Sequence, residues 1–373
     1  MPQLLDTSDP DFERRFAALL EEKREADAGV DAEVAAILGE VAARGDAALI
    51  EMTERWDRLR LTPATLAFAP EEIDAAVAAV AAEDRAALEL AAERIRAYHE
   101  RQVPADARWT DALGAELGWR WTPVDAAGLY VPGGLASYPS SLLMNAIPAR
   151  VAGVRRLVVC APTPDGAVNP LVLLAARLAG VETVYRIGGA QAIAALAYGT
   201  ATVAPVDKIT GPGNAWVAAA KRRVFGRVGI DMIAGPSEVL VLADAANDPD
   251  WLALDLLAQA EHDAAAQSIL VTDDAGFGRA VAAAVERRLA TLARREIAGA
   301  SWRAHGAVVT VRTWDEAVAL ADRIAPEHLQ ICTADAEALA GRVRHAGAIF
   351  IGALTPEAIG DYVGGPNHVL PTA

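Results

Sequence analysis

The chain has 373 residues, of which 53% are hydrophobic and 23% charged, and its net charge at neutral pH is −16. A chain of this length and hydrophobicity buries a large core, which excludes intrinsic disorder, a fibre and a disulfide-stapled miniprotein. The acidic charge disfavours binding to nucleic-acid phosphates and to anionic lipids, so neither kind of partner is expected.

Several features of the sequence predict a cytoplasmic location. Residues 1–9 carry no basic segment ahead of an apolar one, so we expect no secretory signal. No apolar run reaches the ~18 residues that a membrane span needs. The two cysteines, Cys160 and Cys332, lie in separate apolar runs outside any C-x-x-C pair, which indicates a reducing compartment and argues against a thiolate zinc site.

The first hundred residues have the pattern of helices. In residues 71–98, apolar side chains such as Ile73, Val77 and Ile95 recur near a period of 3.6, with charged residues between them. We expect residues 1–25 to form a helical arm. This region contains no concentration of residues typical of catalysis.

From about residue 125, short apolar runs alternate with alanine-rich helical stretches. The predicted strands are 156–160, 183–187, 208–210, 239–242, 269–272, 308–311, 329–332 and 348–351, and the predicted helices include 170–179, 190–198, 215–224, 249–262 and 314–323. Continuous apolar strands that alternate with helices indicate an α/β protein with parallel sheets covered on both faces. The number of strands favours two doubly wound units over one.

Glycine and proline mark the predicted loops, for example in residues 131–134, 188–189, 211–213 and 234–237. Ligands of open α/β sheets gather at the carboxyl ends of the strands, so we expect the chemistry there. No G-x-G-x-x-G occurs, so spacing alone does not predict NAD. Such loops either bind phosphate through backbone N–H groups or are simple tight turns, which are commoner.

Gln259 and His262 are three residues apart late in a predicted helix, so both could reach one metal ion. A polar helix end with a histidine near the negative end of the helix dipole explains the pair equally simply, and is commoner. Asp361 could complete a site of nitrogen and oxygen ligands, a donor set suited to zinc or manganese.

Glu327 and His328 are adjacent at the start of a predicted strand, a pairing suited to proton transfer because histidine titrates near neutrality. A solvated loop pair is the alternative. Ser237 precedes another strand without a local base, and His368 lies in a glycine- and proline-rich stretch. Spacing alone therefore favours a metal-assisted enzyme with a histidine base.

Longer motifs carry a resemblance to a known family. They are GLYVPGG (128–134), GGAQAIAALAYG (188–199), TGPGNAWV (210–217), IDMIAGPSEVLVLAD (230–244), LLAQAEH (256–262), APEHL (325–329), GDY (360–362) and NHVLPT (367–372). Their order and content closely resemble the histidinol dehydrogenase family from about residue 125 onward.

The resemblance implies NAD-dependent oxidation of L-histidinol to L-histidine through histidinaldehyde, the last step of histidine biosynthesis. It implies zinc ligands at Gln259, His262 and Asp361, which also bind substrate through the metal. Substrate would further contact Ser237, His328 and, more weakly, His368. His328 would be the base and Glu327 would activate water, while Tyr130, Gln191 and Asn214 would hold NAD.

The resemblance also implies two incomplete Rossmann-like domains. A larger one, residues 26–129 and 239–373, would carry the metal and catalytic residues, and residues 130–238 would form an inserted NAD-binding domain. Members of the family continue into a small C-terminal domain that swaps between the subunits of a homodimer, and this sequence ends before it. Three explanations fit this early end: a natural variant, a deliberately shortened chain, and a sequence that is given only in part.

Two further interpretations remain beside histidinol oxidation. The chain could be a related zinc-dependent dehydrogenase of another amino-alcohol or a polyol. It could also be a shortened homologue with impaired catalysis that keeps the fold and ligand binding.

Overall fold

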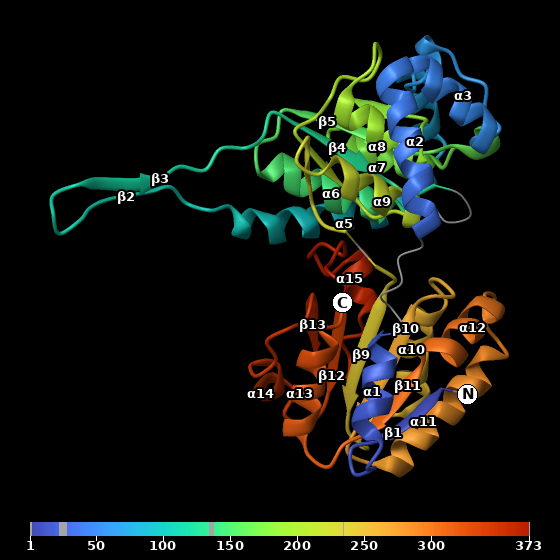
Figure 1. The fold of residues 1–373 in the computed structure, drawn as a ribbon, viewed down its shortest axis with the longest axis vertical. Coiled ribbons are helices and arrows are strands. Elements are labelled where there is room, and N and C mark those ends of the chain that lie inside the picture. The colour runs from blue at the N-terminus through green and yellow to red at the C-terminus, as the bar shows by residue number, and fades with distance from the viewer. Residues whose placement is uncertain (1, 22–27, 134–137, 234, 373) are drawn as a thin grey trace. The chain divides into compact units, whose positions relative to one another are not determined.

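A computed structural model describes residues 2–21, 28–133, 138–233 and 235–372. The chain divides into two compact units. The first unit comprises residues 1–26, 234–359 and 370–373, and the second comprises residues 27–233 and 360–369. Each unit contains a parallel sheet with helices on both faces, which confirms the predicted fold class (Figure 1).

The first unit contains a six-stranded sheet in the order β1-β11-β10-β9-β12-β13. All of its neighbouring strands are parallel. Its strands are β1 (Gln3–Asp6), β9 (Glu238–Ala243), β10 (Gln267–Thr272), β11 (Ala307–Thr310), β12 (His328–Cys332) and β13 (Ala348–Ile351). Counted from β9, the order is 3-2-1-4-5 with β1 added at the edge, so five strands follow the Rossmann order.

Helices cover both faces of this sheet because its strands are apolar on both sides. Leu240 and Leu242 face one core, and Val239 and Val241 face the other. The first core includes residues of α1 (Phe12–Glu21), α13 (Trp314–Ile324) and α14 (Ala336–Ala340). The second includes residues of α10 (Pro249–Ala260), α11 (Ala275–Leu289) and α12 (Arg295–His305).

The second unit repeats this strand order in a five-stranded parallel sheet, β6-β5-β4-β7-β8. Its strands are β4 (Ala126–Tyr130), β5 (Arg156–Cys160), β6 (Thr183–Tyr185), β7 (Lys208–Thr210) and β8 (Gly229–Ile230). Counted from β4, the order is again 3-2-1-4-5. The order reverses between β4 and β7, as it does between β9 and β12 in the first unit, and these are the switch points of the two sheets.

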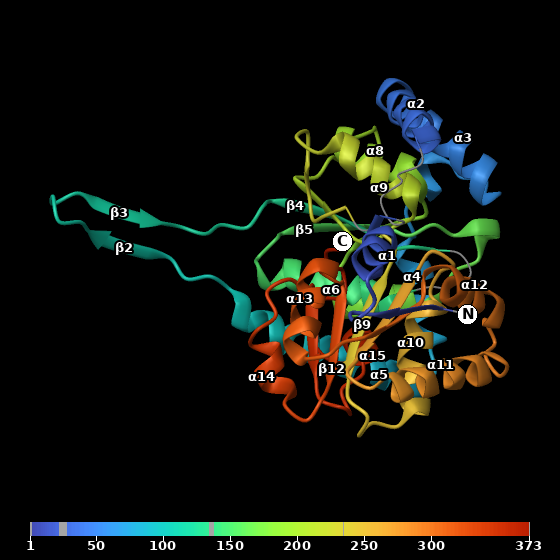
Figure 2. The same cartoon turned by 60° about the horizontal axis from the view of Figure 1, so that its bottom comes forward.

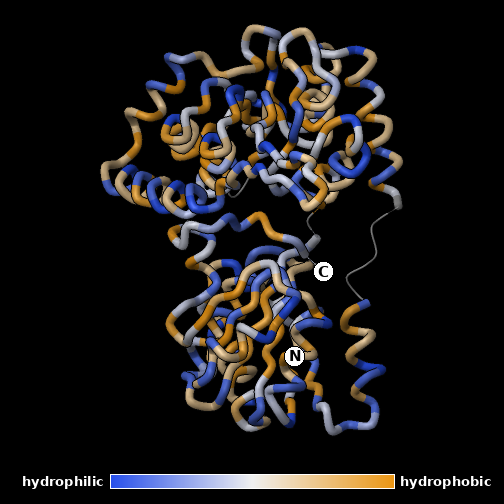
Figure 3. Tube along the Cα trace, turned by 90° about the vertical axis from the view of Figure 1, so that its left-hand side faces the viewer, coloured by the Kyte–Doolittle hydropathy of each residue, from blue (hydrophilic) through white to orange (hydrophobic). Residues whose placement is uncertain are grey.

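Two helical layers also enclose the second sheet. One contains α2 (Ala28–Arg44), α3 (Asp46–Asp57), α8 (Gly189–Tyr198) and α9 (Ala215–Val224). The other contains α4 (Pro70–Ala78), α5 (Ala82–His99), α6 (Pro139–Val151) and α7 (Pro170–Leu178). Short 3₁₀ turns occur at Pro63–Thr65, Glu100–Gln102 and Pro164–Gly166, and α15 (Ala358–Tyr362) ends the helical series. Hydrophobic residues are concentrated inside each unit (Figure 3).

A two-stranded antiparallel ribbon extends from the second unit (Figure 2). It consists of β2 (Ala107–Thr110) and β3 (Glu116–Trp119). Large apolar side chains are exposed on and beside it, including Trp109, Trp119, Trp121 and Leu113, the last with 93% of its surface exposed. A ribbon of this size is marginally stable alone, so these side chains are candidates for a protein contact.

The structure differs from the predicted division into domains, and residues 360–369, with Asp361 and His368, belong to the second unit and not to the predicted larger domain. Residues 3–6 form β1, an edge strand of the first sheet, so residues 1–25 are not wholly a helical arm. Residues 27–129 belong to the second unit and not to the unit of Glu327 and His328. The reason is that β4 is a central strand of the second sheet and α2 to α5 pack on its faces.

Among the described helices, none combines the length and apolar character that crossing a membrane requires.

Candidate active site

Glu327 and His328 are presented at the start of β12 by a well-defined turn. α13 ends at Ile324 and is capped by Ala325, whose φ of 48° lies in the left-handed region, and Pro326 then prevents the helix from continuing. His328 enters the sheet opposite Val239 of β9. Both side chains are buried at the amino edge of the switch point between β9 and β12.

The hydrogen bonding of His328 defines its protonation. Its Nδ1 lies 2.9 Å from the backbone oxygen of Glu238, which can only accept, so Nδ1 carries the proton. The other ring nitrogen, Nε2, is then the basic atom of the neutral imidazole. Burial lowers the pKa of His328 below its usual value, which favours this neutral form. His328 is therefore arranged as a proton acceptor.

Glu327 is held by the same peptide segment. Its Oε2 accepts a hydrogen bond of 3.1 Å from the backbone N–H of Glu238 and lies 3.6 Å from His328 Nδ1. The N–H and the carbonyl of Glu238 thus each position one member of the acid–imidazole pair. Ser237 immediately precedes Glu238, and its carbonyl accepts from the N–H of Gln267 at 3.0 Å. Glu327 and His328 are therefore both held by the residue that follows Ser237.

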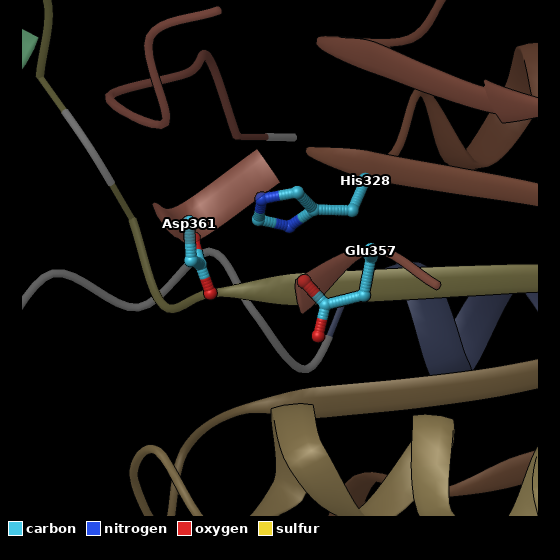
Figure 4. Close-up of side chains that lie close together, drawn as sticks. All are labelled: His328, Glu357 and Asp361. Carbon is cyan, nitrogen blue, oxygen red and sulfur yellow. The ribbon is translucent and has the colours of Figure 1, made fainter. Parts of the chain in front are cut away.

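Glu357 is a residue that the sequence analysis did not single out. It is buried, and its carboxylate and the imidazole of His328 offer ligand atoms within 4.8 Å of each other (Figure 4). No pattern in the sequence pointed to it, because its approach to His328 depends on how β12, β13 and the segment after them fold. Asp361, labelled in the same view, belongs to the second unit and is described with it below.

Gln259 and His262 lie at the carboxyl end of α10. Gln259 is buried in the last turn, and the N–H of His262 donates to its carbonyl at 3.1 Å. His262 itself lies just beyond the helix, in an exposed turn, and not within the helix as predicted. The negative end of a helix dipole favours a cation at this position.

The Glu327–His328 pair lies where β12 begins, at the start of the predicted strand. It is therefore at the amino ends of the strands, whereas the general rule for open α/β sheets led us to expect chemistry at the carboxyl ends. The carboxyl side of this switch point is filled by Asn247, whose Nδ2 donates to the carbonyl of Cys332 at 2.6 Å and to that of Asp244 at 3.0 Å. These hydrogen bonds leave less room for a ligand there.

In the second unit, by contrast, the predicted residues do lie at the carboxyl edge. Tyr130 ends β4, and its hydroxyl oxygen accepts from the N–H of Gly189 at 3.0 Å, at the start of α8. Burial raises the pKa of Tyr130 to about 12, so it stays neutral. Gln191, in the first turn of α8, is 3% exposed, and its Oε1 has no hydrogen-bond partner among the described residues.

Asn214 is the N-cap of α9. Its Oδ1 accepts from the N–H of Val217 at 3.2 Å, and the residue remains exposed. A cavity of about 350 Å³ opens at the carboxyl ends of β4 and β5, lined in part by Pro132, Gly133, Pro162 and Thr163 but by none of Tyr130, Gln191 and Asn214. The carboxyl edge of the second sheet thus offers helix N-termini and a hollow.

Asp361 and His368 also belong to the second unit. The imidazole of His368 lies between Asp361 and Ser141. Its Nε2 lies 2.9 Å from Ser141 Oγ, and its Nδ1 lies 3.5 Å from Asp361 Oδ1. Asn367 fixes the same segment by donating to the carbonyl of Met144 at 2.8 Å. Ser141, near the start of α6, was not predicted, and its position far from His368 in the sequence gave no signal.

Together these features are typical of an α/β enzyme, with acid–base chemistry on one Rossmann-like unit and a cavity at the carboxyl edge of the other. A family model described as histidinol dehydrogenase matches residues 20–373. The histidinol dehydrogenase of Cereibacter sphaeroides is 74% identical over 373 residues, covering 100% of this chain and 86% of the relative. That of Ruegeria pomeroyi is 73% identical with the same coverage.

A solved structure agrees with these relatives. The crystal structure of histidinol dehydrogenase from Elizabethkingia anophelis matches with a TM-score of 0.94 and 34% sequence identity, covering 100% of this chain and 85% of that one. The chain belongs to the histidinol dehydrogenase family, a family of oxidoreductases.

Proposed function

We propose that the chain oxidises L-histidinol to L-histidine through histidinaldehyde, with two NAD⁺ as hydride acceptors. Membership of the family supports this activity and its place in histidine biosynthesis. The observation that carries the proposal is the hydrogen bond from His328 Nδ1 to the Glu238 carbonyl, because it leaves a buried basic nitrogen available.

The reaction consists of two oxidations, and a different residue acts in each. His328 Nε2 takes the hydroxyl proton of histidinol as a hydride leaves the same carbon for NAD⁺, giving the aldehyde. Glu327 then takes a proton from water as its oxygen adds to the aldehyde. A second hydride leaves the hydrated aldehyde for another NAD⁺, and the resulting carboxylic acid releases its proton to solvent to give the carboxylate. Ser237 and His368 are proposed to contact the substrate.

We propose Gln259, His262 and Asp361 as ligands of zinc, with manganese as the alternative. One amide oxygen, one imidazole and one carboxylate form a donor set that fits either ion. The carboxyl end of α10 adds a favourable partial negative charge beside Gln259. When bound, the metal would orient the amine and imidazole of histidinol.

Tyr130, Gln191 and Asn214 are proposed to hold NAD. Gln191 Oε1 is a buried acceptor that a hydroxyl or amide donor of the cofactor would satisfy. The N-termini of α8 and α9 favour the anionic pyrophosphate.

The metal assignment predicts the effect of a single substitution. His262→Ala removes one of three proposed protein ligands, so zinc affinity is expected to fall by at least about 100-fold. Competition with a chromogenic chelator measures it. His345→Ala, which removes an exposed histidine of the same unit, should leave zinc affinity unchanged. Equal zinc affinity in the His262→Ala variant and the unmodified chain would refute this ligand.

A panel of alcohols tests the substrate. We expect NADH production from L-histidinol to exceed that from other amino-alcohols and from polyols, because only histidinol combines an amine and an imidazole as metal ligands. Faster turnover of another alcohol would establish the alternative dehydrogenase. Histidinol binding without turnover in folded protein would establish the catalytically impaired homologue.

We also propose a cytoplasmic homodimer. The exposed tryptophans of the β2–β3 ribbon support a contact with a second copy, since homo-oligomers are the commonest assemblies and apolar clusters mark interfaces.

A further inference from the structure

Lys221 is a buried cation that the proposed reaction does not use. It lies on α9 with 3% of its side chain exposed. Its Nζ donates to the carbonyl of Gly211 at 2.9 Å and forms an ion pair with Asp231. A buried charge of this kind is costly unless it is paired and hydrogen-bonded, and Lys221 has both an ion pair and a hydrogen bond.

Asp231 completes a closed arrangement around one residue, Gly211. Its Oδ2 accepts from the N–H of Gly211 at 2.8 Å, while its other carboxylate oxygen pairs with Lys221. The N–H and the carbonyl of Gly211 are therefore held by opposite ends of one ion pair. Asp231 is itself fixed, because its backbone N–H donates to the carbonyl of Ile209 at 3.2 Å. We call this pair the Lys221–Asp231 clamp.

The clamped glycine lies at the switch point of the second sheet. Gly211 follows β7 and has a φ of 117°, and a Cβ there would lie 2.1 Å from the carbonyl oxygen of Tyr130. Only glycine fits so close to the end of β4. Residues 211–214, the 211–214 loop, then lead directly into α9, with Asn214 as its N-cap.

We propose that Lys221 and Asp231 are positioning residues that hold the 211–214 loop in the conformation that binds NAD. The inference rests on the proposed cofactor site. Of the residues proposed for that site, Tyr130 has its carbonyl beside Gly211, and Asn214 follows Gly211 at the end of the same loop. Neither charged group needs to touch the cofactor. The clamp fixes the backbone path between β7 and α9, and hence the separation of these two residues.

A double substitution separates positioning from stability. Lys221→Met alone strands a buried carboxylate and should lower the melting temperature. Lys221→Met with Asp231→Leu removes both charges and should restore much of that stability, yet it leaves Gly211 without either side-chain hydrogen bond. If the clamp positions the loop, the double variant stays folded and its Kd for NADH rises about tenfold or more.

NADH binding is measured from the fluorescence of the reduced nicotinamide. Thermal unfolding of the same samples shows whether each variant is folded. KM for NAD⁺ should rise with Kd, while kcat at saturating NAD⁺ stays within about twofold. Arg222→Met, which removes the exposed cation next to Lys221, is the matched control and should change neither quantity.

Two distinguishable results would overturn the inference. NADH affinity equal to that of the unmodified chain in a folded double variant would show that the clamp serves stability alone. Absence of NADH binding in the unmodified chain would refute the proposed cofactor site, and the clamp's positioning role with it.

Discussion

Replacing His328 with asparagine is expected to lower the rate of histidinol oxidation by about 10²- to 10⁴-fold, the usual contribution of a general base. The variant lacks the basic Nε2 that the hydrogen bond from Nδ1 to the Glu238 carbonyl makes available. The readout is the first hydride transfer, measured as NADH formation in a single turnover. His345→Asn, at an exposed position of the same unit, should retain the full rate.

The pH dependence provides a second test of His328. Because burial lowers the pKa of His328 below its ordinary value of 6.5, the neutral base persists to lower pH than that of an exposed histidine. kcat/KM for histidinol should therefore fall only as the pH drops below 6.5, and the limb should disappear in His328→Asn. A full rate in the asparagine variant, or an unchanged acid limb, would rule out His328 as the base.

Replacing Glu327 with glutamine is expected to slow the second oxidation by about 10²- to 10⁴-fold and to leave the first nearly unchanged. Glutamine keeps an oxygen that can accept from the N–H of Glu238, so the local structure should hold, but it cannot take a proton from water. Single-turnover NADH formation from histidinol and from histidinaldehyde measures the two steps separately.

Aldehyde trapping provides the complementary evidence for Glu327. With a carbonyl reagent present, the Glu327→Gln variant should yield one NADH and one trapped aldehyde per histidinol. Glu337→Gln, which changes an exposed carboxylate on α14, should behave as the unmodified chain does. Equal slowing of both oxidations in Glu327→Gln would assign Glu327 to the base or to structure instead of to water activation.

The strand pattern was predictable because both sheets are buried on both faces. The predicted strands at 156–160, 208–210 and 348–351 match β5, β7 and β13 to the residue. β1 was missed because a four-residue edge strand has a pattern too short to distinguish from the helix beside it. The β2–β3 ribbon was missed because each of its strands has only four residues, too short a run for a period of two to stand out.

The sequence placed Glu327 and His328 at the start of a strand, and the structure places them at the start of β12. The general rule that ligands gather at the carboxyl ends of open α/β sheets points to the other edge of this sheet. In the first unit, the amino edge brings β12 beside the carboxyl end of α10, a position that favours a cation. In the second unit, the carboxyl edge presents the N-termini of α8 and α9, which favour a phosphate.

Contacts between residues far apart in the chain could not be predicted from the sequence. Ser141 meets His368, and Asp231 meets Gly211, only because the sheet order brings distant segments together. Neither serine nor aspartate at those positions carries a spacing signal. Glu357 could not be predicted either. It approaches His328 only because β12 and β13 pair in parallel and Glu357 follows β13 in the chain.

The most direct test of the proposed function is the number of NADH molecules formed for each L-histidinol consumed, with NAD⁺ in excess and zinc supplied. The account predicts two NADH and one L-histidine per histidinol. One NADH with accumulation of the aldehyde, or no NADH from protein shown to be folded and to contain zinc, would contradict it.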